Sequence, residues 1–330
     1  MNTGTYVTLA LVLGGEFVNG WTDAPNATAA AVATKLLSKK AALRLAVVLN
    51  FAGTLASLFF GAAVAKTIGT GIVDPSAINL DTINAAMCAV IAWGVIAGLK
   101  GLPVSKSHAL FAGLAGAALA VGGFGALLGT GWLTILKGVG ISTVLVFSAA
   151  LAVSWLVRLA NPDRIPEEVW RGWQVLTVCL VAFGHGWNDG LKFIGVFALV
   201  RLLGHDTATF IVEPWTIVLC AFVMGLGTYA GGWSIVQRIG QEMVKNGYLA
   251  YQGVLAELIA ALGIAGTALG GIPMSTTHTV VSSIAGAKAS RGFKEVDWGT
   301  VGVIVRGWIL TIVFCAPVAF IFSFVQTRLL

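Results

Sequence analysis

Long apolar stretches alternate with short polar breaks along the whole chain. The longest apolar stretches cover residues 42–65, 82–99, 132–159, 215–233, 254–269 and 301–324. A helix needs about 20 apolar residues to cross the hydrocarbon core of a bilayer. The pattern therefore predicts an all-α polytopic membrane protein with roughly ten to twelve membrane segments, the shorter and interrupted stretches included.

The polar breaks occur twice, in the same order. The sequence HGWND at 185–189 echoes NGWTD at 19–23, and GIPMSTTH at 271–278 echoes GLPVSKSH at 101–108. Both echoes recur at an offset of about 166 to 170 residues, as a duplicated half requires. If each half crosses the membrane an odd number of times, the two repeats are inverted and contain broken helices and two re-entrant hairpins.

The most polar connection lies between the two halves. Its sequence, NPDRIPEE at 161–168, contains two prolines and alternating charges, which are typical of a surface linker. We therefore predict a first membrane repeat over 1–160, a polar linker over 161–171 and a second membrane repeat over 172–330. The linker is short, so we expect the two repeats to pack into one transport domain.

Composition supports a membrane protein and leaves no room for a sizeable soluble domain. Of the 330 residues, 57% are hydrophobic and 10% are charged, whereas soluble domains carry about 25% charged residues. The net charge of +6 comes from basic residues in short connections, as expected for cytoplasmic loops that face a lipid bilayer, and no aromatic-rich basic patch predicts nucleic-acid binding. These basic residues are Lys35, Lys39, Lys40, Arg44, Arg158, Arg164, Arg171, Arg238, Lys245, Lys288, Arg291 and Lys294.

The first polar break combines a carboxylate with an amide. Asp23 and Asn26 lie three residues apart, so on a helix they share one face. Pro25 between them removes a backbone donor, and the carbonyls that it frees would complete a site for a hard cation such as sodium. The alternative is a helix cap, which the recurrence of the motif at Asn188 and Asp189 disfavours.

The second polar break places a proline before hydroxyl groups and a histidine. Serine and threonine cap the helix that follows, and a helix N-terminus binds oxyanions through its free N–H groups. One such break would more often be a kink, but two in register predict a pair of anion-binding hairpins. The hydroxyl groups of the two breaks belong to Ser105, Ser107, Ser275, Thr276 and Thr277.

Two lysines accompany these breaks. Lys192 follows Asp189 by three residues and would need a partner at membrane depth, either Asp189 or a bound anion, unless it reaches the membrane surface. Lys106 lies inside the first hairpin sequence. It would attract the anion, pair with an acid such as Asp23, or face cytosolic water.

Four further ionisable residues have open roles. His108 and His278 occupy equivalent repeat positions and would relay protons, donate to the anion, or order the hairpins through a backbone carbonyl. Glu16 and Glu257 lie within apolar segments and would serve cation coupling or helix–helix bonding. A Ser–His hydrolase is disfavoured because no buried carboxylate follows as an orienting partner, so we do not expect an enzyme.

Taken together, these motifs resemble the inorganic phosphate transporter family, the PiT-type permeases. Residues 16–26 are similar to the family's first signature, with the core N-G-x-x-D-x-x-N. Residues 183–192 resemble the second signature, and their H-G-x-N-D-G-x-K pattern is closest to the low-affinity bacterial branch. Residues 272–278 match its P-x-S-T-T-H loop, while 227–240 and 253–261 resemble its glycine-rich and A-E-x-x-A-A segments.

The resemblance implies import of inorganic phosphate by alternating access, coupled to sodium or protons, in a plasma membrane. It implies a pseudo-symmetric site between the halves, in which Asp23, Asn26, Asn188 and Asp189 form the ion–substrate region. The residues that would line its anion cradle are Ser105, Ser107, Ser275, Thr276 and Thr277. It brings in no enzyme cofactor, although a divalent metal that travels with phosphate is a further candidate co-substrate. Whether the protein forms a homodimer is left open.

The chain departs from the family pattern in three places. Lys106 stands where the family usually has a small hydroxyl residue, Trp21 and Trp187 are bulkier than usual, and Pro25 replaces a common alanine. A lysine in the hairpin would replace one coupling cation, which leaves the sodium stoichiometry and the identity of the oxyanion open. The alternatives are a permease for sulfate or another tetrahedral oxyanion, and an anion channel or receptor.

Overall fold

The computed structural model describes residues 3–60, 62–244 and 247–329, and Lys245 of the basic loops and the end residues 1–2 and 330 of the predicted repeats lie outside these ranges. The described backbone forms helices and two isolated bridges, Val73 to Leu127 and Val244 to Val296. The α-helices are α1 Thr3–Thr22, α2 Ala29–Ala33, α3 Lys39–Leu55, α4 Ser57–Phe60, α5 Ala63–Thr70, α6 Leu80–Leu99, α7 Lys106–Gly122, α8 Gly129–Gly140, α9 Val146–Leu159, α10 Glu167–Leu203, α11 Pro214–Ala230, α12 Trp233–Gln237, α13 Ala250–Leu269, α14 Thr276–Ala289 and α15 Trp298–Leu329. The short 3₁₀ and π segments are η1 Ala24–Thr28, η2 Pro75–Ala77, η3 Gly123–Ala126, η4 Ile141–Leu145, η5 Pro162–Arg164, η6 Arg238–Glu242 and η7 Phe293–Glu295.

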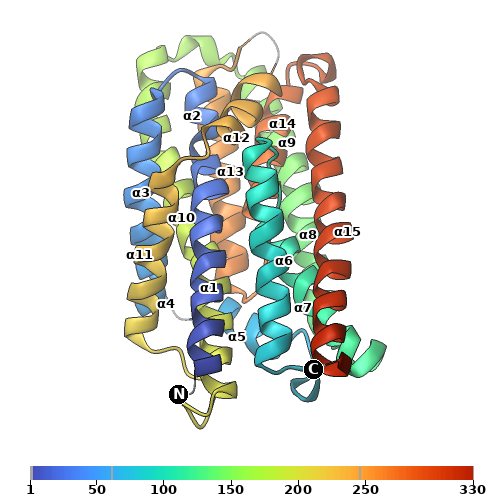
Figure 1. Ribbon diagram of the computed structural model, residues 1–330. Helices are drawn as coiled ribbons and strands as arrows, with labels where there is room; N and C mark the ends of the chain where they lie inside the picture. The colour runs from blue at the N-terminus through green and yellow to red at the C-terminus, as the bar shows by residue number, and fades with distance from the viewer. Residues whose placement is uncertain (1–2, 61, 245–246, 330) are drawn as a thin grey trace.

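The second half repeats the first in the opposite direction. In Figure 1, α1 rises from the bottom of the bundle, whereas α10 descends from the linker at the top. Likewise α6 rises and α13 descends, so α1 begins and α15 ends at the same end of the molecule. The predicted all-α fold with inverted repeats is confirmed.

Backbone geometry matches at equivalent positions of the two repeats. Gly101 and Gly271, which follow α6 and α13, have φ angles of 60° and 65°. Lys35 and His205 are also left-handed, with φ angles of 59° and 56°. A side chain is strained in this region unless local structure requires it, so the shared left-handed turns indicate a shared chain path.

Each half packs against the hairpin of the other half. Helix α7 of the first hairpin packs along α15, and α14 of the second packs along α9. The approach is close because glycine lies at both interfaces: a Cβ added at Gly116 would lie 2.0 Å from the carbonyl oxygen of Ala316, and one at Gly286 would lie 2.3 Å from that of Phe147. Small residues allow this contact between helices in a membrane, and the two halves are interlocked as a result.

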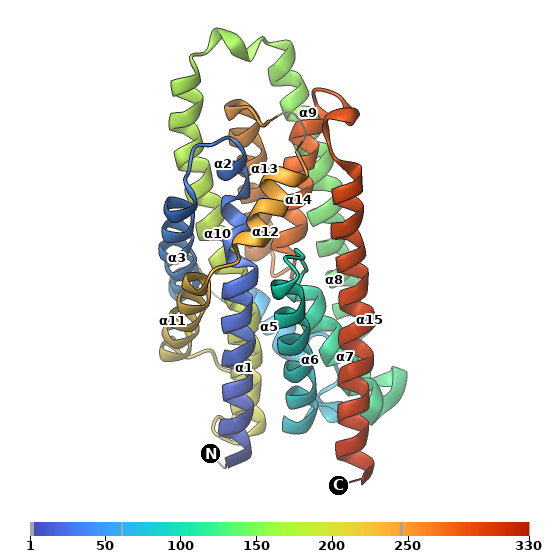
Figure 2. The same cartoon turned by 45° about the horizontal axis from the view of Figure 1, so that its top comes forward.

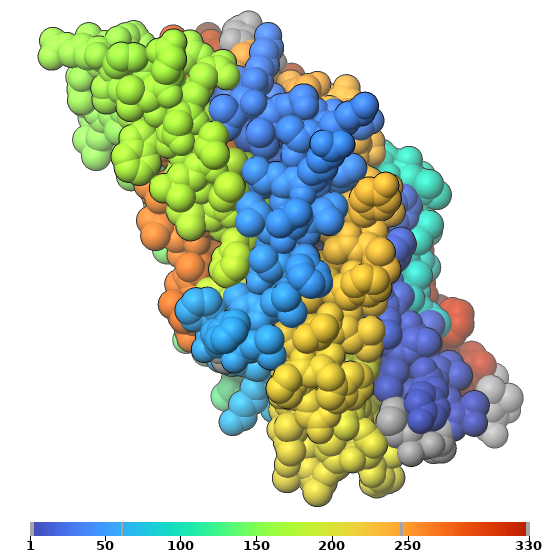
Figure 3. Space-filling model, turned by 90° about the vertical axis from the view of Figure 1, so that its left-hand side faces the viewer, coloured from blue at the N-terminus to red at the C-terminus, as the bar shows by residue number. Residues whose placement is uncertain are grey.

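Two more helix pairs complete the bundle. Helix α1 packs against α11, and α10 packs against α3, in the same exchange between halves. Helices α3 and α11 lie side by side on the face shown in Figure 3. When the top of the molecule is turned forward, α2 and α12 are seen together near that end (Figure 2). The polar motifs therefore lie beneath packed helices rather than on a surface.

Six helices in the described ranges are long and apolar enough to cross a membrane, and the pair Pro214–Ala230 and Trp233–Glu242, bent by 71°, would make a seventh. The six are Lys39–Phe60, Leu80–Leu99, Lys106–Ala126, Gly129–Leu159, Ala250–Leu269 and Trp298–Thr327. This number is smaller than the ten to twelve predicted segments, because polar residues such as Glu16, Asn19 and Asp189 interrupt the apolar sequence of α1 and α10, and other helices are short. Exposed apolar side chains such as Leu136, Ile309 and Val313 provide a surface for lipid.

The two signature motifs differ in local structure. The first breaks the helix as predicted: α1 ends at Thr22, and Pro25 lies in the first turn of η1. The second motif does not break its helix: α10, which is 37 residues long, runs through the motif without interruption. The position equivalent to Pro25 is Leu191, which keeps its backbone N–H and allows the helix to continue.

Candidate functional site

Polar side chains from both halves meet at the centre of the molecule. We define the central cluster as Asp23, Asn26, Asp189, Lys192, Thr276 and Thr277, which are linked by direct hydrogen bonds. Every member is at most 2% exposed. Uncompensated polar groups at this depth are costly, so a buried cluster of this kind indicates a functional site.

The two hairpin serines position the start of each hairpin helix. Ser105 accepts a hydrogen bond from the backbone N–H of His108 at 3.2 Å, and Ser275 accepts one from His278 at 3.2 Å. These are N-cap bonds, which explain why serine directly precedes α7 and α14. The predicted helix termini are therefore present in both repeats, and the serine oxygens act as caps.

The second hairpin joins the carboxylates of the two motifs. Thr276 donates to Asp189 Oδ1 at 3.0 Å, and Thr277 donates to Asp23 Oδ1. Asn26 Nδ2 donates to the same Asp23 oxygen at 2.7 Å. The two threonines thus hold both carboxylates at the N-terminus of α14, where the helix dipole favours negative charge.

Lys192 neutralises one of these carboxylates. Its Nζ lies 2.5 Å from Asp189 Oδ1, and both side chains are at most 2% exposed. The other oxygen of this carboxylate, Oδ2, lies 3.8 Å from Nε2 of His185. The predicted pairing of Lys192 with Asp189 is present, and the lysine side chain does not extend to a membrane surface.

The first hairpin differs from the second in its leading residue. Lys106 occupies the position equivalent to Thr276 and is 1% exposed, yet its Nζ has no hydrogen-bond partner among the residues that the structure describes. It lies within electrostatic range of Asp23 and Asp189 without touching either. A buried, unpaired ammonium is unfavourable unless an anion or carboxylate approaches it. Ser107 instead links the hairpins by donating to the carbonyl of Met274 at 3.0 Å.

The rings of the two hairpin histidines lie against each other, tilted by 37°. The rings of His108 and His278 have centroids 4.6 Å apart, and His278 stacks on Trp308 at 3.6 Å. In the described parts of the chain, Nδ1 of His108 and both ring nitrogens of His278 have no hydrogen-bond partner. The predicted bond from a histidine to a backbone carbonyl is therefore not formed by these nitrogens, and ring contacts join the hairpins instead.

The two predicted glutamates lie in different places. Glu16 is fully buried on α1, close to Asn19 and within electrostatic range of Asp189 and Lys192. Glu257 accepts from Thr177 at 2.7 Å and from Gln174 at 3.3 Å. These contacts place Glu257 in a separate polar group between α10 and α13.

Two residues near the cluster were not among the predicted site residues. Asn50 lies on α3, and its Oδ1 is 3.0 Å from Nδ1 of His185. His185 belongs to the second signature, so its place in the motif could have identified it. Asn50 could have been identified because it is a single amide in an apolar span, where a polar group without a partner is costly.

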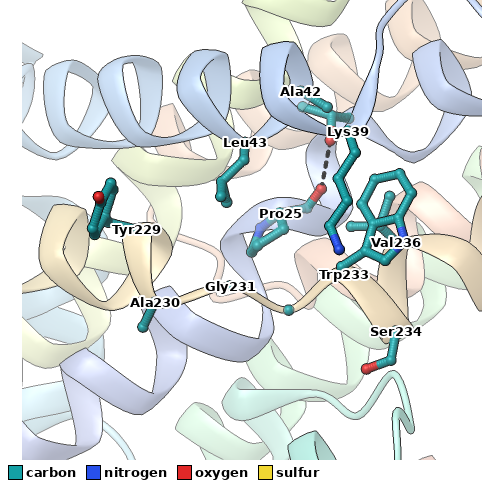
Figure 4. A pocket seen from close by; sticks show the side chains of 12 residues that line it. Pro25, Lys39, Ala42, Leu43, Tyr229, Ala230, Gly231, Trp233, Ser234 and Val236 are labelled. Carbon is teal, nitrogen blue, oxygen red and sulfur yellow. Dashed lines mark hydrogen bonds between the residues drawn. The ribbon is translucent and has the colours of Figure 1, made fainter.

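A pocket of about 450 Å³ lies next to the cluster, on the other side of η1. Pro25 and Thr28 of η1 form one wall, and the bend between α11 and α12 forms another. Figure 4 shows Lys39 extending into it toward Trp233, with Nζ 5.2 Å from the ring centroid. The segment η1, which carries Asn26, therefore separates this open pocket from the buried central cluster.

Inverted, interlocked helical repeats around a buried polar centre define the class of protein: a polytopic membrane transport protein. The chain matches the Phosphate transporter family over residues 19–165 and 159–319, and it belongs to that family. It is 36% identical, over 92% of this chain and 90% of the relative, to a protein of Rhizobium meliloti (strain 1021) named "Probable low-affinity inorganic phosphate transporter". A protein of Bacillus subtilis (strain 168) with the same name is 35% identical over 97% of this chain and 96% of its own.

The fold also has a solved counterpart. A structure described as "The sodium-dependent phosphate transporter" superposes with a TM-score of 0.84 over 100% of both chains, at 23% sequence identity. The likeness establishes the fold of this chain. The resemblance seen in the sequence motifs is confirmed by the family match and by the relatives.

Proposed function

We propose that this protein is a symporter that imports inorganic phosphate across a prokaryotic plasma membrane by alternating access, driven by sodium or protons. The observation that carries the proposal is the unpaired, buried ammonium of Lys106 beside the central cluster. An anion that reaches this centre gains a cationic partner, and the names of the relatives support phosphate as that anion.

The anion would bind at the hairpin helix starts. Lys106 supplies a charged donor, the capped starts of α7 and α14 supply backbone dipoles, and the amide of Asn188 is buried with neither polar atom bonded to the described residues. Lys192, Ser107 and the threonines of α14 complete the donor set. Hydroxyl donors rotate easily, so Thr276 and Thr277 can exchange a carboxylate for an anion.

Charge balance supports coupling to cations. With Asp23 and Asp189 ionised, Lys106 and Lys192 protonated and the nearby Glu16 neutral, the charges of the centre cancel. A phosphate dianion would then leave a buried excess of negative charge, which is costly unless cations bind with it. Asn26 Oδ1 and Asp189 Oδ2 have no partner within the described residues, and such oxygens suit sodium.

The charge of the loops supports an orientation. In Figure 1 the linker and the start of α3 lie at one end of the bundle, and the turns before α6 and α11 lie at the other. The first group contains Lys39, Arg164 and Arg171, and the second contains Asp74, Asp206 and Glu213. Cytoplasmic loops carry the excess of lysine and arginine, so the linker end would face the cytoplasm. The pocket beside η1 would then be a vestibule open to the cytoplasm, and η1 would separate this vestibule from the substrate site.

Uptake by the purified protein tests this function. Proteoliposomes would be given labelled phosphate, with sulfate as competitor and with sodium, proton and magnesium gradients varied separately. We expect concentrative phosphate uptake under a cation gradient and weak competition by sulfate. Failure to take up phosphate under every gradient would overturn the proposal, and equal competition by sulfate would make the protein a general oxyanion permease.

A lysine variant tests the anion site in the same assay. Lys106→Ala should raise the phosphate concentration for half-maximal uptake roughly 10- to 100-fold, since hydrogen bonds to charged groups contribute about 1.5–3 kcal/mol. The matched control is Lys100→Ala, because Lys100 precedes the same hairpin but is exposed. An unchanged concentration dependence for Lys106→Ala would remove this lysine from the site.

A further inference from the structure

A groove runs along the surface of the bundle between α15 and the pair formed by α9 and α14. Helices α9 and α14 pack along each other, whereas α15 packs along α7 and α6. All three helices that border the groove extend toward the linker end of the molecule (Figure 1). The groove has a volume of about 400 Å³, within the range of about 300–1,000 Å³ that is usual for ligand pockets. None of its lining residues belongs to the central cluster.

Two ring contacts bridge this groove. Phe147 lies 6.4 Å from Trp298 near the start of α15, and His278 stacks on Trp308 with 3.6 Å between the ring centroids. At 1.5 Å per residue, the stretch of α15 from Trp298 to Trp308 is about 15 Å long. This length is half of the hydrocarbon core of a bilayer, which is about 30 Å thick. The groove therefore has the depth of one leaflet, measured from the linker end.

The walls of the groove suit a hydrocarbon chain. Helix α14 contributes Val281, Ser282 and Ala285, and α15 contributes Val301 and Val305. Within the described structure, no charged residue lines the groove. Val305 is 36% exposed, so the groove is open to its surroundings along α15. In a membrane these surroundings are lipid, and an apolar chain lying here would make the van der Waals contacts that the walls leave unfilled.

Basic residues surround the end of the groove that lies near the linker. Arg291 and Lys294 follow α14 in the chain, and both are exposed. Arg158, at the end of α9, donates a hydrogen bond to the carbonyl of Ser290 at 2.9 Å. Trp298 is also exposed at this level, where tryptophan is enriched in membrane proteins because the bilayer surface lies there.

The acidic residues of this connection do not cancel the positive charge. Glu295 pairs with Lys288 at 3.4 Å, and Asp297 accepts a hydrogen bond from the backbone N–H of Thr300 at 3.0 Å. Lys288 therefore balances one acid, and the cations at the mouth of the groove outnumber the other. An excess of basic residues at the bilayer surface attracts anionic lipid headgroups.

We propose that this groove binds one acyl chain of an anionic phospholipid from the leaflet at the linker end, with the headgroup beside Arg291 and Lys294. The depth of one leaflet, the apolar walls and the cationic mouth together match such a lipid, whereas a zwitterionic lipid gains less at the mouth. A second copy of the chain fits this face less well. Two copies related by a two-fold axis through the groove would bring the same cations together.

The groove reaches the second hairpin through Trp308. The indole ring of Trp308 stacks on His278, and Thr276 and Thr277 at the start of the same helix belong to the central cluster. A lipid that fills the groove would support α14 and Trp308 from outside, so we expect faster phosphate uptake when the lipid is bound. This consequence rests on the proposed function, whereas lipid binding itself does not.

Native mass spectrometry of the purified, detergent-solubilised protein tests the site. Phosphatidylglycerol and phosphatidylethanolamine with the same acyl chains would be titrated separately. We expect one phosphatidylglycerol to be retained more tightly than the zwitterionic lipid, and Val305→Trp, which fills the groove, to remove it. Arg291→Gln combined with Lys294→Gln should reduce the preference for phosphatidylglycerol about 10- to 30-fold, because two cations beside the headgroup are lost.

Each variant has a matched control. Val303→Trp places the same ring at an exposed position of α15 that does not line the groove. Lys40→Gln combined with Arg44→Gln removes two exposed cations from α3, a helix that contributes no residue to the groove. Both controls should retain phosphatidylglycerol as the unmodified protein does.

The outcomes decide the proposal. Equal retention of the two lipids by the unmodified protein, or unchanged retention in Val305→Trp, would overturn it. A dimer that Val305→Trp dissociates would also overturn it, because the groove would then face a second copy. If Val305→Trp does not yield folded protein, the double variant of Arg291 and Lys294 decides by the change in lipid preference. Phosphate uptake without a preferred lipid would refute only this inference, whereas lipid retention without phosphate uptake would refute only the proposed function.

Discussion

At the scale of single residues, the hairpin starts show how two equivalent positions acquire different chemistry. Thr276 uses its hydroxyl to hold Asp189, while Lys106 has a charge and no bonded partner in the described structure. Asn26 and Lys192 also differ in charge. The neutral amide of Asn26 donates a hydrogen bond to its aspartate, whereas Lys192 donates through a charged ammonium group. Both of these differences between the repeats change the charge at the site, and the proposed coupling to cations depends on that charge.

The unpaired lysine yields the first prediction. If Lys106 replaces a coupling cation, Lys106→Ser should make phosphate uptake more dependent on sodium, because a mobile cation must then supply the missing charge. The measurement is uptake into proteoliposomes as a function of sodium concentration. An unchanged sodium dependence would show that Lys106 serves the anion alone.

The buried ion pair between Lys192 and Asp189 yields the second prediction. Asp189→Asn should abolish concentrative uptake and also destabilise the protein by about 3–5 kcal/mol, because it leaves Lys192 charged and unpaired. Adding Lys192→Met should restore most of the stability without restoring uptake. Thermal unfolding and uptake of the single and double variants separate the two effects; recovery of uptake in the double variant would argue against a role in coupling.

At the scale of elements, close helix contacts depend on glycine at particular positions. A Cβ at Gly116 would lie 2.0 Å from backbone of α15, whereas one at Gly266 on α13 meets open space. We therefore expect Gly116→Ala to lower the melting temperature and Gly266→Ala to stabilise by about 0.5–1 kcal/mol through helix propensity. Equal melting temperatures for the two variants would contradict the packing described for α7 and α15.

The turn between α10 and α11 provides a pH-dependent prediction outside the membrane. A hydrogen bond from Arg201 lowers the pKa of Glu213 from its usual 4.5. A carboxyl whose folded pKa is depressed stabilises the fold above its unfolded pKa, and this contribution is lost as pH falls through the folded value. Glu213→Gln should thus lose less stability than the unmodified protein when unfolding is measured at pH 4.5 and below.

The elements also show what sequence reasoning could and could not predict. The Ser105 and Ser275 caps follow from local chemistry, and both were predictable. The continuity of α10 was not predicted, although Leu191 in place of proline allows it. Contacts such as Thr277 with Asp23 join residues far apart in the chain, so no local pattern could reveal them. Asn50 was missed for the same reason, because its partner lies on another helix.

At the scale of the whole molecule, the proposed orientation makes the two ends of the bundle distinguishable. Ser234 lies in the pocket at the linker end and Ser76 lies near the opposite end, and both are exposed. In right-side-out vesicles, Ser76→Cys should react with a membrane-impermeant maleimide and Ser234→Cys should not, with the reverse result in inside-out vesicles. The opposite labelling pattern would invert the orientation and make the pocket an external vestibule.

The exchange of hairpins between halves also sets an order for biosynthesis. Helix α7 enters the membrane long before α15, the helix that covers it, has been translated. Until then its glycine-lined face must remain against lipid or a temporary neighbour. A ribosome that stops before α15 leaves a chain that contains every residue of the central cluster but lacks the helix against which α7 packs.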